Sequence, residues 1–191
     1  MMGSLAYDLF MLPLERFALS RLRRRLIPLA EGKVLELGAG TGANLRYYDR
    51  RRVEEILLSD LRAGRRIQKR ARQASARFVP ADVEALPFAD SRFDTVVFTL
   101  LFCSVDNPDR GMAEIRRVLK PGGRIIYLEH VLGCSSATQN LQRRMTPLWR
   151  RVSGNCHLDR DTLSVIEQAG FIPEEIDRRA NCVLIGGVAR R

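Results

Sequence analysis

Short apolar runs alternate with helical stretches along most of this chain. Five such runs predict β-strands, at residues 34–37, 56–59, 77–79, 94–99 and 124–128. The segments between and after them predict helices, at residues 43–48, 62–75, 109–119 and 159–169. Strands separated by helices form a largely parallel sheet with crossover helices. We therefore predict an α/β fold with a doubly wound sheet.

The last two apolar runs, 171–177 and 182–189, are too close together for a helix between them. Strands joined so directly pair in antiparallel fashion. We expect them to form a hairpin at one edge, so that the sheet is mostly parallel with an antiparallel C-terminal strand.

Residues 1–30 precede the sheet and carry helical patterns over 5–12 and 14–27. In the second stretch apolar residues recur at helical spacing and arginines crowd the end, which predicts an amphipathic helix. Two interpretations stay open: a helix packed on the core with solvated arginines, and a helix lying on a membrane surface. We expect residues 1–30 to form a helical lid and residues 31–191 to form a single domain.

The composition supports one globular domain. The 191 residues are 46% hydrophobic and 28% charged, which allows a sizeable core and argues against a disordered or fibrous chain. The net charge of +10 comes almost wholly from arginine, since the lysines are only Lys33, Lys69 and Lys120. These charges are scattered along the chain, so they favour a solvated basic surface over a nucleic-acid partner.

The four cysteines are Cys103, Cys134, Cys156 and Cys182. They lie far apart and form no CxxC pair, which fits neither a zinc ribbon nor a dense disulfide framework. Cys156 lies near His157 and Asp159, but no second cluster of ligand types accompanies this group, so we expect no metal. The spacing predicts a reducing, cytoplasmic setting.

No segment predicts a membrane span. The most apolar run, 95–105, is too short to cross a bilayer, and the positive charges near the N-terminus follow the apolar stretch instead of preceding it. We expect neither a transmembrane helix nor a signal peptide. Peripheral membrane contact remains open through the amphipathic N-terminal helix.

The strongest local motif is VLELGAGTG at residues 34–42, where a strand runs into a glycine-rich turn. Gly38, Gly40 and Ala43 match the dinucleotide pattern GxGxxG/A loosely, so a nicotinamide cofactor is one interpretation. The GxGxG spacing of Gly38, Gly40 and Gly42, with Glu36 two residues before it, favours the aminoacyl end of S-adenosylmethionine instead.

Acidic residues follow the next two predicted strands. Asp60 ends the second strand, where a carboxylate can accept both ribose hydroxyls of either cofactor. Asp82 follows the third strand and can bind the adenine amino group, with Val83 against the ring. Because the carboxyl ends of parallel strands meet at one edge of an open sheet, we expect these side chains to form one ligand site.

Three segments, LELGAGTGANL, ADVEALPFADSRFDTVVF and EIRRVLKPGGRIIYLEHV, resemble class I S-adenosylmethionine-dependent methyltransferases of the ubiquinone-biosynthesis and type 11 group. The likeness spans residues 32–131 and implies the Rossmann-like fold of that class, with a reversed seventh strand. It implies S-adenosylmethionine as cofactor and S-adenosylhomocysteine as product. The residues it assigns to cofactor binding are Glu36, Gly38, Gly40, Gly42, Asn44, Asp60, Asp82, Val83 and Thr99.

A narrower resemblance concerns the animal methyltransferase-like 7 proteins, which methylate small thiols at membranes. FTLLFCSVDNP, LEHV, Trp149, the stretch 154–158 and the segment 167–171 are similar to them. Those animal proteins have a hydrophobic N-terminal anchor, whereas this chain has only the amphipathic stretch. Membrane anchoring is therefore not transferred.

The candidate catalytic residues follow the fourth and fifth predicted strands. Cys103, with Ser104, lies where this fold faces the transferred methyl group, and an ordinary buried cysteine is the alternative. Glu129 and His130 are candidates for a general base or for orienting the acceptor, and a structural histidine is the alternative for His130. The stretch 132–158 is expected to recognise the acceptor, with Trp149 among four arginines.

These features predict a methyltransferase acting on a small or lipid-like acceptor. A thiol is favoured, since a thiol ionises easily and needs little more than orientation. The alternatives are N-methylation of a phospholipid such as phosphatidylethanolamine, and a scaffold that binds the cofactor without turnover.

Overall fold

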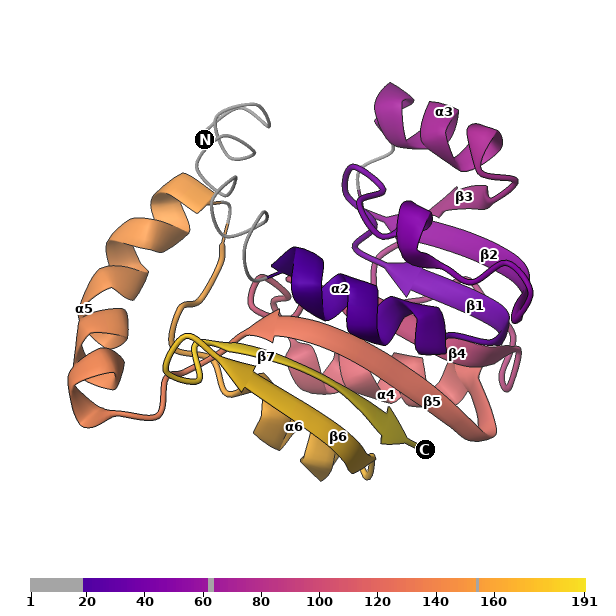
Figure 1. The fold of residues 1–191 in the computed structure, drawn as a ribbon. Helices are drawn as coiled ribbons and strands as arrows, with labels where there is room; N and C mark the ends of the chain where they lie inside the picture. Colours follow the sequence, from indigo (N-terminus) through magenta and orange to yellow (C-terminus); the bar gives the residue numbers. More distant parts are fainter. Residues whose placement is uncertain (1–18, 62–63, 154) are drawn as a thin grey trace.

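The structure is a computed structural model and describes residues 19–61, 64–153 and 155–191. It contains a seven-stranded sheet in the order β3-β2-β1-β4-β5-β7-β6 (Figure 1). The strands are β1 (Gly32–Leu37), β2 (Val53–Asp60), β3 (Arg77–Pro80), β4 (Phe93–Thr99), β5 (Leu119–His130), β6 (Ile172–Arg179) and β7 (Leu184–Arg190).

The strand directions confirm the predicted sheet. β1 pairs in parallel with β2 and β4, β2 pairs in parallel with β3, and β4 in parallel with β5. β7 is antiparallel to both β5 and β6, so the C-terminal hairpin lies at one edge. The carboxyl ends of the first five strands therefore lie along one edge of the sheet, and β7 begins at that edge, opposite the end of β5.

The described helices are α2 (Ser20–Leu26), α3 (Arg65–Gln73), α4 (Pro108–Val118), α5 (Ser136–Ser153) and α6 (Thr162–Gln168). Side chains of α2 and α3 share one hydrophobic cluster with alternate strand residues such as Ile126 and Leu128. Side chains of α4 and α6 share a second cluster with the intervening residues Ile125 and Tyr127. Because successive strand residues point to opposite faces, these two cores make three layers.

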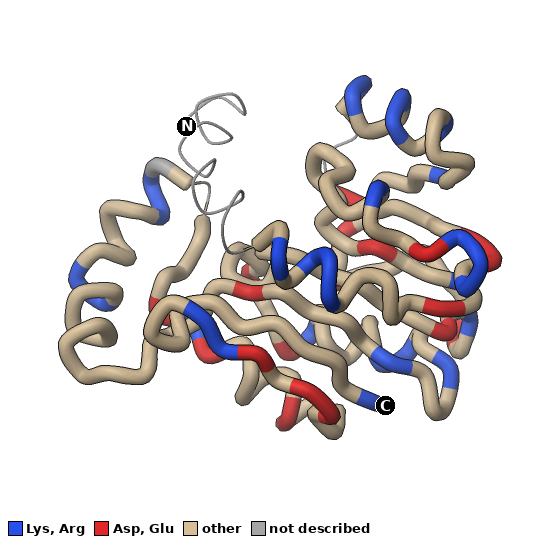
Figure 2. Tube along the Cα trace, in the orientation of Figure 1, with Lys and Arg blue, Asp and Glu red and all other residues tan. Residues whose placement is uncertain are grey.

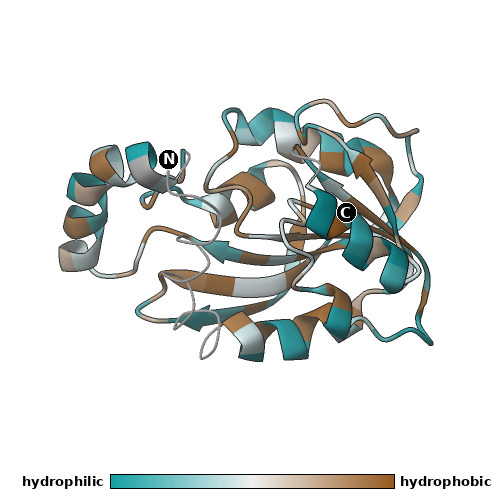
Figure 3. Ribbon diagram, turned by 90° about the horizontal axis from the view of Figure 1, so that it is seen from above, coloured by the Kyte–Doolittle hydropathy of each residue, from teal (hydrophilic) through white to brown (hydrophobic). Residues whose placement is uncertain are grey.

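Views from two directions separate α5 from these layers. Figure 3 shows hydrophobic stretches along the central strands and alternating hydrophobic and hydrophilic stretches along the helices. In Figure 1, α5 stands at the side of the sheet. The sequence pattern did not single out α5 as a helix. Its register places Gln142 and Thr146 on a buried side and Leu141 and Leu148 on an exposed one.

The helix predicted at 43–48 is wrong: the structure has only a short 3-10 turn, Leu45–Tyr47. Tyr48 leaves the helical conformation, with ψ of 131°. Its hydroxyl donates to Glu36 Oε2 at 2.7 Å. The chain therefore turns back toward β1 before a second helical turn can form.

Two of the cysteines are joined. Cys134, after β5, forms a disulfide with Cys182, in the turn between β6 and β7. The two lie 48 residues apart in the sequence, but the pairing of His130 with Leu184 brings their segments together. The spacing alone gave no sign of this bond, and the predicted reducing setting loses its support.

The predicted N-terminal lid falls largely on residues 1–18, outside the described part of the chain. The described remainder packs on the sheet: Leu19, Leu22 and Leu26 are buried, and Leu22 and Leu26 join the core on that face. Among the described helices, none has the length and apolarity to cross a membrane.

Candidate functional site

The glycine-rich loop follows β1 and turns at three glycines. Gly38, Gly40 and Gly42 have φ angles of 63°, 52° and 74°, a conformation that residues with a Cβ rarely adopt. A Cβ added to Gly40 would meet no atom closer than 3.9 Å, the distance to the Gly38 carbonyl oxygen. The backbone of this loop can therefore be approached closely by a ligand.

Asp60 ties this loop to the end of β2. Its Oδ2 accepts a hydrogen bond from the Gly40 N–H at 2.9 Å. The Ala39 N–H also donates to the carbonyl oxygen of Ser59, at 3.0 Å. A carboxylate beside a glycine loop, at the carboxyl end of the neighbouring strand, is where open α/β sheets bind a ribose.

Glu36 lies beneath the loop and is 1% exposed. Its Oε1 accepts from Asn44 Nδ2 at 3.1 Å, and its Oε2 accepts from the Tyr48 hydroxyl. Burial raises the pKa of Glu36 to about 7, against the opposing effect of these two hydrogen bonds and of the Arg23 charge. Both oxygens are thus engaged within the protein, so Glu36 shapes the loop from below.

Asn44 connects this carboxylate to two other elements. Its Nδ2 also donates to Thr99 Oγ1, at the end of β4, at 3.1 Å. Its Oδ1 accepts from Arg23 Nε, on α2, at 2.8 Å, and Arg23 is 4% exposed. Sequence reasoning predicted Glu36, Asn44 and Thr99 but missed Arg23 and Tyr48, because nothing in the local pattern marks them as partners.

Asp82 and Val83 lie one strand further out, after β3. Asp82 Oδ1 accepts from the Glu84 N–H at 2.9 Å, which closes a small turn. Val83 is 9% exposed and packs into the core on the α4 face. Together with Asp60, these residues continue the same edge of the sheet.

The residues along this edge fit S-adenosylmethionine. The loop offers an open backbone at Gly40, and Glu36, Asp60 and Asp82 place acidic side chains at the carboxyl ends of adjacent strands. The carboxylates of Asp60 and Asp82 complement a cofactor that carries an ammonium and a sulfonium group and presents hydroxyl donors. When bound, the cofactor supplies an electrophilic methyl group.

Glu129 organises the loop after β4. Leu100 has a positive φ of 52°, and the next N–H groups turn toward Glu129 Oε1, which accepts from Leu101 at 2.8 Å and from Phe102 at 3.3 Å. Glu129 is fully buried, its Oε2 has no hydrogen-bond partner, and burial raises its pKa to about 8.

His130 follows Glu129 directly, so its side chain points to the opposite face of the sheet. Its Nδ1 is buried and has no hydrogen-bond partner. Burial lowers the pKa of His130 to about 4, and the imidazole is neutral near pH 7. The two predicted base candidates therefore lie on different sides of the sheet.

Cys103, in the loop after β4, lies beside Cys156, in the segment after α5. Cys103 is 3% exposed, and its Sγ lies 3.6 Å from both the Leu100 carbonyl oxygen and Ser104 Oγ. A hydrogen bond with Cys156, burial and the Glu129 charge raise the pKa of Cys103 well above its usual value. The bond with Cys103 lowers the pKa of Cys156 to about 7, with help from Trp149, Ser104 and the Arg160 charge.

The predicted recognition stretch is built around α5. Gln142 donates to the Val131 carbonyl oxygen at 3.0 Å and accepts from the Gly133 N–H at 2.8 Å. Leu141, Met145 and Leu148, at helical spacing, are 62%, 43% and 60% exposed. α5 is thus fastened to the end of β5 on one side and presents an apolar stripe on the other.

Arginines accompany that stripe without forming a single basic face. Figure 2 shows Lys and Arg on α2, α3, α5 and β6, with Asp and Glu between them along the sheet. This distribution agrees with the scattered charge of the sequence. Among the described residues, no group of three or more potential ligands is arranged to hold a metal ion.

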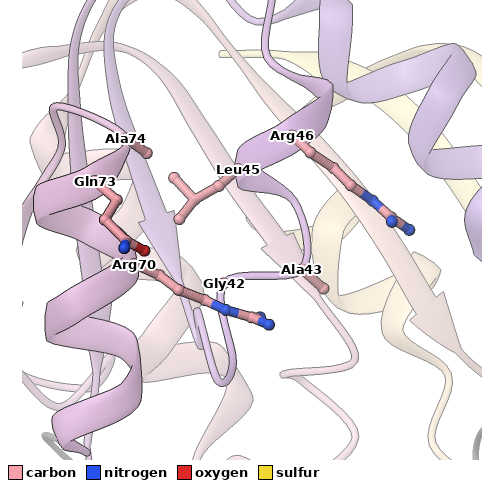
Figure 4. Close-up of a pocket in the computed structure, with 7 residues that line it drawn as sticks. All are labelled: Gly42, Ala43, Leu45, Arg46, Arg70, Gln73 and Ala74. Carbon is pink, nitrogen blue, oxygen red and sulfur yellow. The ribbon is translucent and has the colours of Figure 1, made fainter.

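A cavity of about 450 Å³ lies on the outer side of the glycine loop, between the turn at 45–47 and α3 (Figure 4). Its lining comprises Gly42, Ala43, Leu45, Arg46, Arg70, Gln73 and Ala74. Arg70 donates to the Thr41 carbonyl oxygen at 2.6 Å. The cavity shares only Gly42 with the predicted cofactor residues, so it borders the site without containing it.

Known proteins resemble this chain in sequence. The family described as "Methyltransferase domain" matches residues 35–127. Thiol S-methyltransferase TMT1B of Rattus norvegicus is 35% identical over 159 residues, which cover 77% of this chain and 63% of the relative. The chain thus spans less than two thirds of that relative. The ubiquinone/menaquinone biosynthesis C-methyltransferase UbiE of Idiomarina loihiensis is 30% identical over 202 residues, covering 90% of this chain and 79% of the relative.

The solved structures include the same fold. A geranyl diphosphate methyltransferase in complex with S-adenosylmethionine superposes with a TM-score of 0.72 and 14% identity, covering 90% of this chain and 83% of the other. Together with the family matches, this confirms the predicted fold and favours S-adenosylmethionine over a dinucleotide as cofactor. The chain belongs to the class I S-adenosylmethionine-dependent methyltransferases.

Proposed function

We propose that this protein transfers the methyl group of S-adenosylmethionine to the sulfur of a small or lipophilic thiol, with S-adenosylhomocysteine as the second product. The observation that carries the thiol preference is the set of groups around Cys156. The pKa of Cys156 is lowered to about 7 by hydrogen bonds with Cys103, Trp149 and Ser104 and by the charge of Arg160. Surroundings that stabilise one thiolate also favour the reactive form of an acceptor thiol beside it.

Cofactor binding is assigned to the edge formed by β1, β2 and β3. Asp60 would hold the ribose, and the open backbone at Gly40 would meet the aminoacyl part. Asp82 and Val83 would face the adenine. Glu36, Asn44 and Thr99 would act by holding the loop and the end of β4 in position, since their hydrogen bonds run to each other.

Acceptor binding is assigned to the loop after β4 and the segments around it. Methyl transfer to a thiolate is a direct displacement, so alignment contributes most of the catalysis. Glu129 would hold the loop 100–103 through its N–H groups. His130 would orient the acceptor; with its pKa lowered to about 4, it is a weak acceptor for the proton of a thiol.

The name of the rat relative supports the thiol, and it describes that protein only. The test is release of S-adenosylhomocysteine with hydrogen sulfide and short alkyl thiols as acceptors, compared with phosphatidylethanolamine liposomes at the same cofactor concentration. We expect turnover with the thiols. Robust lipid methylation without thiol turnover would overturn this proposal.

A second candidate function is methylation of a membrane-resident acceptor, and the exposed stripe Leu141, Met145 and Leu148 on α5 favours it. An apolar helical face flanked by arginines suits a membrane surface. The liposome arm of the same assay tests this candidate, with anionic and neutral vesicles compared. The predicted lid formed by residues 1–30 stays a prediction, to be tested by hydrogen exchange with and without cofactor.

A further inference from the structure

We propose that Cys103 and Cys156 form a dithiol site that reduces small disulfides, in which Cys156 attacks and Cys103 resolves. This inference rests on the proposed function in one respect: the thiol that the site releases belongs to the class proposed as methyl acceptor. The reaction would let the protein draw acceptor thiol from the oxidised form of that compound.

The segments that carry the two cysteines are held together by hydrogen bonds between residues far apart in the chain. The His157 N–H donates to the Cys103 carbonyl oxygen at 2.7 Å. Next to it, Asn155 Nδ2 donates to the Ser104 carbonyl oxygen at 3.3 Å and to Asp106 Oδ1 at 2.8 Å. These bonds hold the segment around Cys156 against the loop after β4, and each of the two thiols shifts the pKa of the other.

The pair is asymmetric in the way that exchange requires. Cys156 is partly exposed, whereas Cys103 is buried. A reactive thiol that solvent reaches, beside a second thiol that resolves the mixed disulfide, is the arrangement of oxidisable cysteine pairs. The donors around Cys156 and the Arg160 charge also favour its thiolate, which is the nucleophile.

Glu129 offers a destination for the proton of the resolving thiol. Its Oε2 is fully buried and has no hydrogen-bond partner. The charge of Glu129 raises the pKa of Cys103, and the charge of Cys156 raises the pKa of Glu129. The pKa of Glu129 is about 8, so above that pH the ionised carboxylate can accept a proton when Cys103 becomes a nucleophile.

The reaction balances in two steps. The Cys156 thiolate attacks a disulfide RSSR, the S–S bond of that molecule breaks, and RS⁻ leaves while a Cys156–S–S–R mixed disulfide forms. Cys103 then gives its proton to Glu129, attacks the Cys156 sulfur and expels the second RS⁻. The two cysteines lose two electrons, the external disulfide gains them, and a Cys103–Cys156 disulfide remains.

The test uses the full chain after removal of reductant and 4,4′-dithiodipyridine as the disulfide. We expect two equivalents of thiopyridone per chain and a Cys103–Cys156 disulfide in the peptide map. Cys103→Ser should release one equivalent and keep a mixed disulfide on Cys156. In Cys156→Ser, the initial rate should fall about tenfold or more, because Cys103 is buried. Release of one equivalent by the unmodified chain, or of two without the cross-link, would overturn the proposal.

Two controls keep the result independent of folding and of the existing disulfide. Phenylarsine oxide bridges neighbouring thiols, so pretreatment should block release from the unmodified chain; undiminished release would contradict a paired site. The double variant Cys134→Ser/Cys182→Ser should still form the Cys103–Cys156 bond, and failure to form it would count against the assignment.

Methyl transfer is measured separately on the reduced chain with a thiol as acceptor. Two equivalents and a cross-link without methylation of any thiol would leave the dithiol site standing and remove the proposed acceptor. Thiol methylation with no cross-link would support the proposed acceptor and overturn the dithiol site.

Discussion

The proposed cofactor half of the site, residues 32–83, is assembled from neighbouring strands and one loop. The proposed acceptor half, residues 100–106, 129–153, 155–160 and 180–184, is assembled from segments far apart in the chain. In the cofactor half, Asp60 contacts Gly40 across adjacent strands. In the acceptor half, Cys134 joins Cys182 and Cys103 contacts Cys156. The cofactor half therefore depends mainly on contacts between the glycine loop and adjacent strands, and the acceptor half on contacts between segments far apart in the chain, so single changes should separate the two.

The largest expected effect is removal of the disulfide. In Cys134→Ser/Cys182→Ser, the free energy of unfolding should fall by about 2–4 kcal/mol, because the bond closes a long loop in the unfolded chain. Affinity for S-adenosylhomocysteine at 25 °C should stay unchanged, since the bond lies in the acceptor half. Urea unfolding and calorimetric titration measure the two quantities. A large loss of affinity for S-adenosylhomocysteine in the folded variant would show that the two halves are not independent.

Replacement of Asp60 is the matching change in the cofactor half. Asp60→Ala removes the acceptor for the Gly40 N–H and the proposed partner of the ribose. We expect affinity for S-adenosylhomocysteine to fall about 100-fold, in line with losing charged hydrogen bonds. The control is Asp90→Ala, since the Asp90 side chain is 76% exposed. Unchanged affinity in Asp60→Ala would show that the assigned ribose site is wrong.

Gly40 and Gly122 test whether the cofactor approaches the backbone of the glycine loop. Gly40 and Gly122 have φ angles of 52° and 74°, and an added Cβ would meet no atom within 3.9 Å at Gly40 or within 4 Å at Gly122. Alanine at either position should cost about 1 kcal/mol of stability, because both backbones are left-handed. Only Gly40→Ala should weaken S-adenosylhomocysteine binding, by about tenfold or more. Equal affinities in the two variants would mean that no ligand approaches Gly40.

The smallest effect concerns Glu129 and pH. Burial raises its pKa to about 8, above the usual value near 4.3. The folded protein therefore binds the proton more tightly than the unfolded chain does. Stability from this group is fully present below the usual pKa and is lost as the pH rises toward 8. In Glu129→Gln, which keeps a side-chain acceptor for Leu101 and Phe102, the fall in melting temperature from pH 5 to pH 8 should be smaller. Parallel pH profiles of the two proteins would contradict this assignment.

Much of the fold could be predicted because its signals are local. Apolar runs marked all seven strands, although β5 begins earlier than predicted, since Leu119 already pairs with Phe93. The helix at 43–48 failed because Tyr48 is drawn to a buried carboxylate that no local pattern reveals. α5 escaped prediction because its buried contacts are polar, through Gln142 and Thr146, so the usual apolar stripe faces outward.

The sequence by itself determined the sheet, the glycine loop and the acidic residues after the strands, because periodicity, turn residues and strand ends are properties of neighbouring positions. Only the tertiary structure decided which groups share an environment. It engaged both oxygens of Glu36, placed Cys103 beside Cys156, and paired Cys134 with Cys182. The physical reason is that burial and contact depend on how the layers pack. Residues distant in the chain therefore shift each other's pKa values and change each other's reactivity.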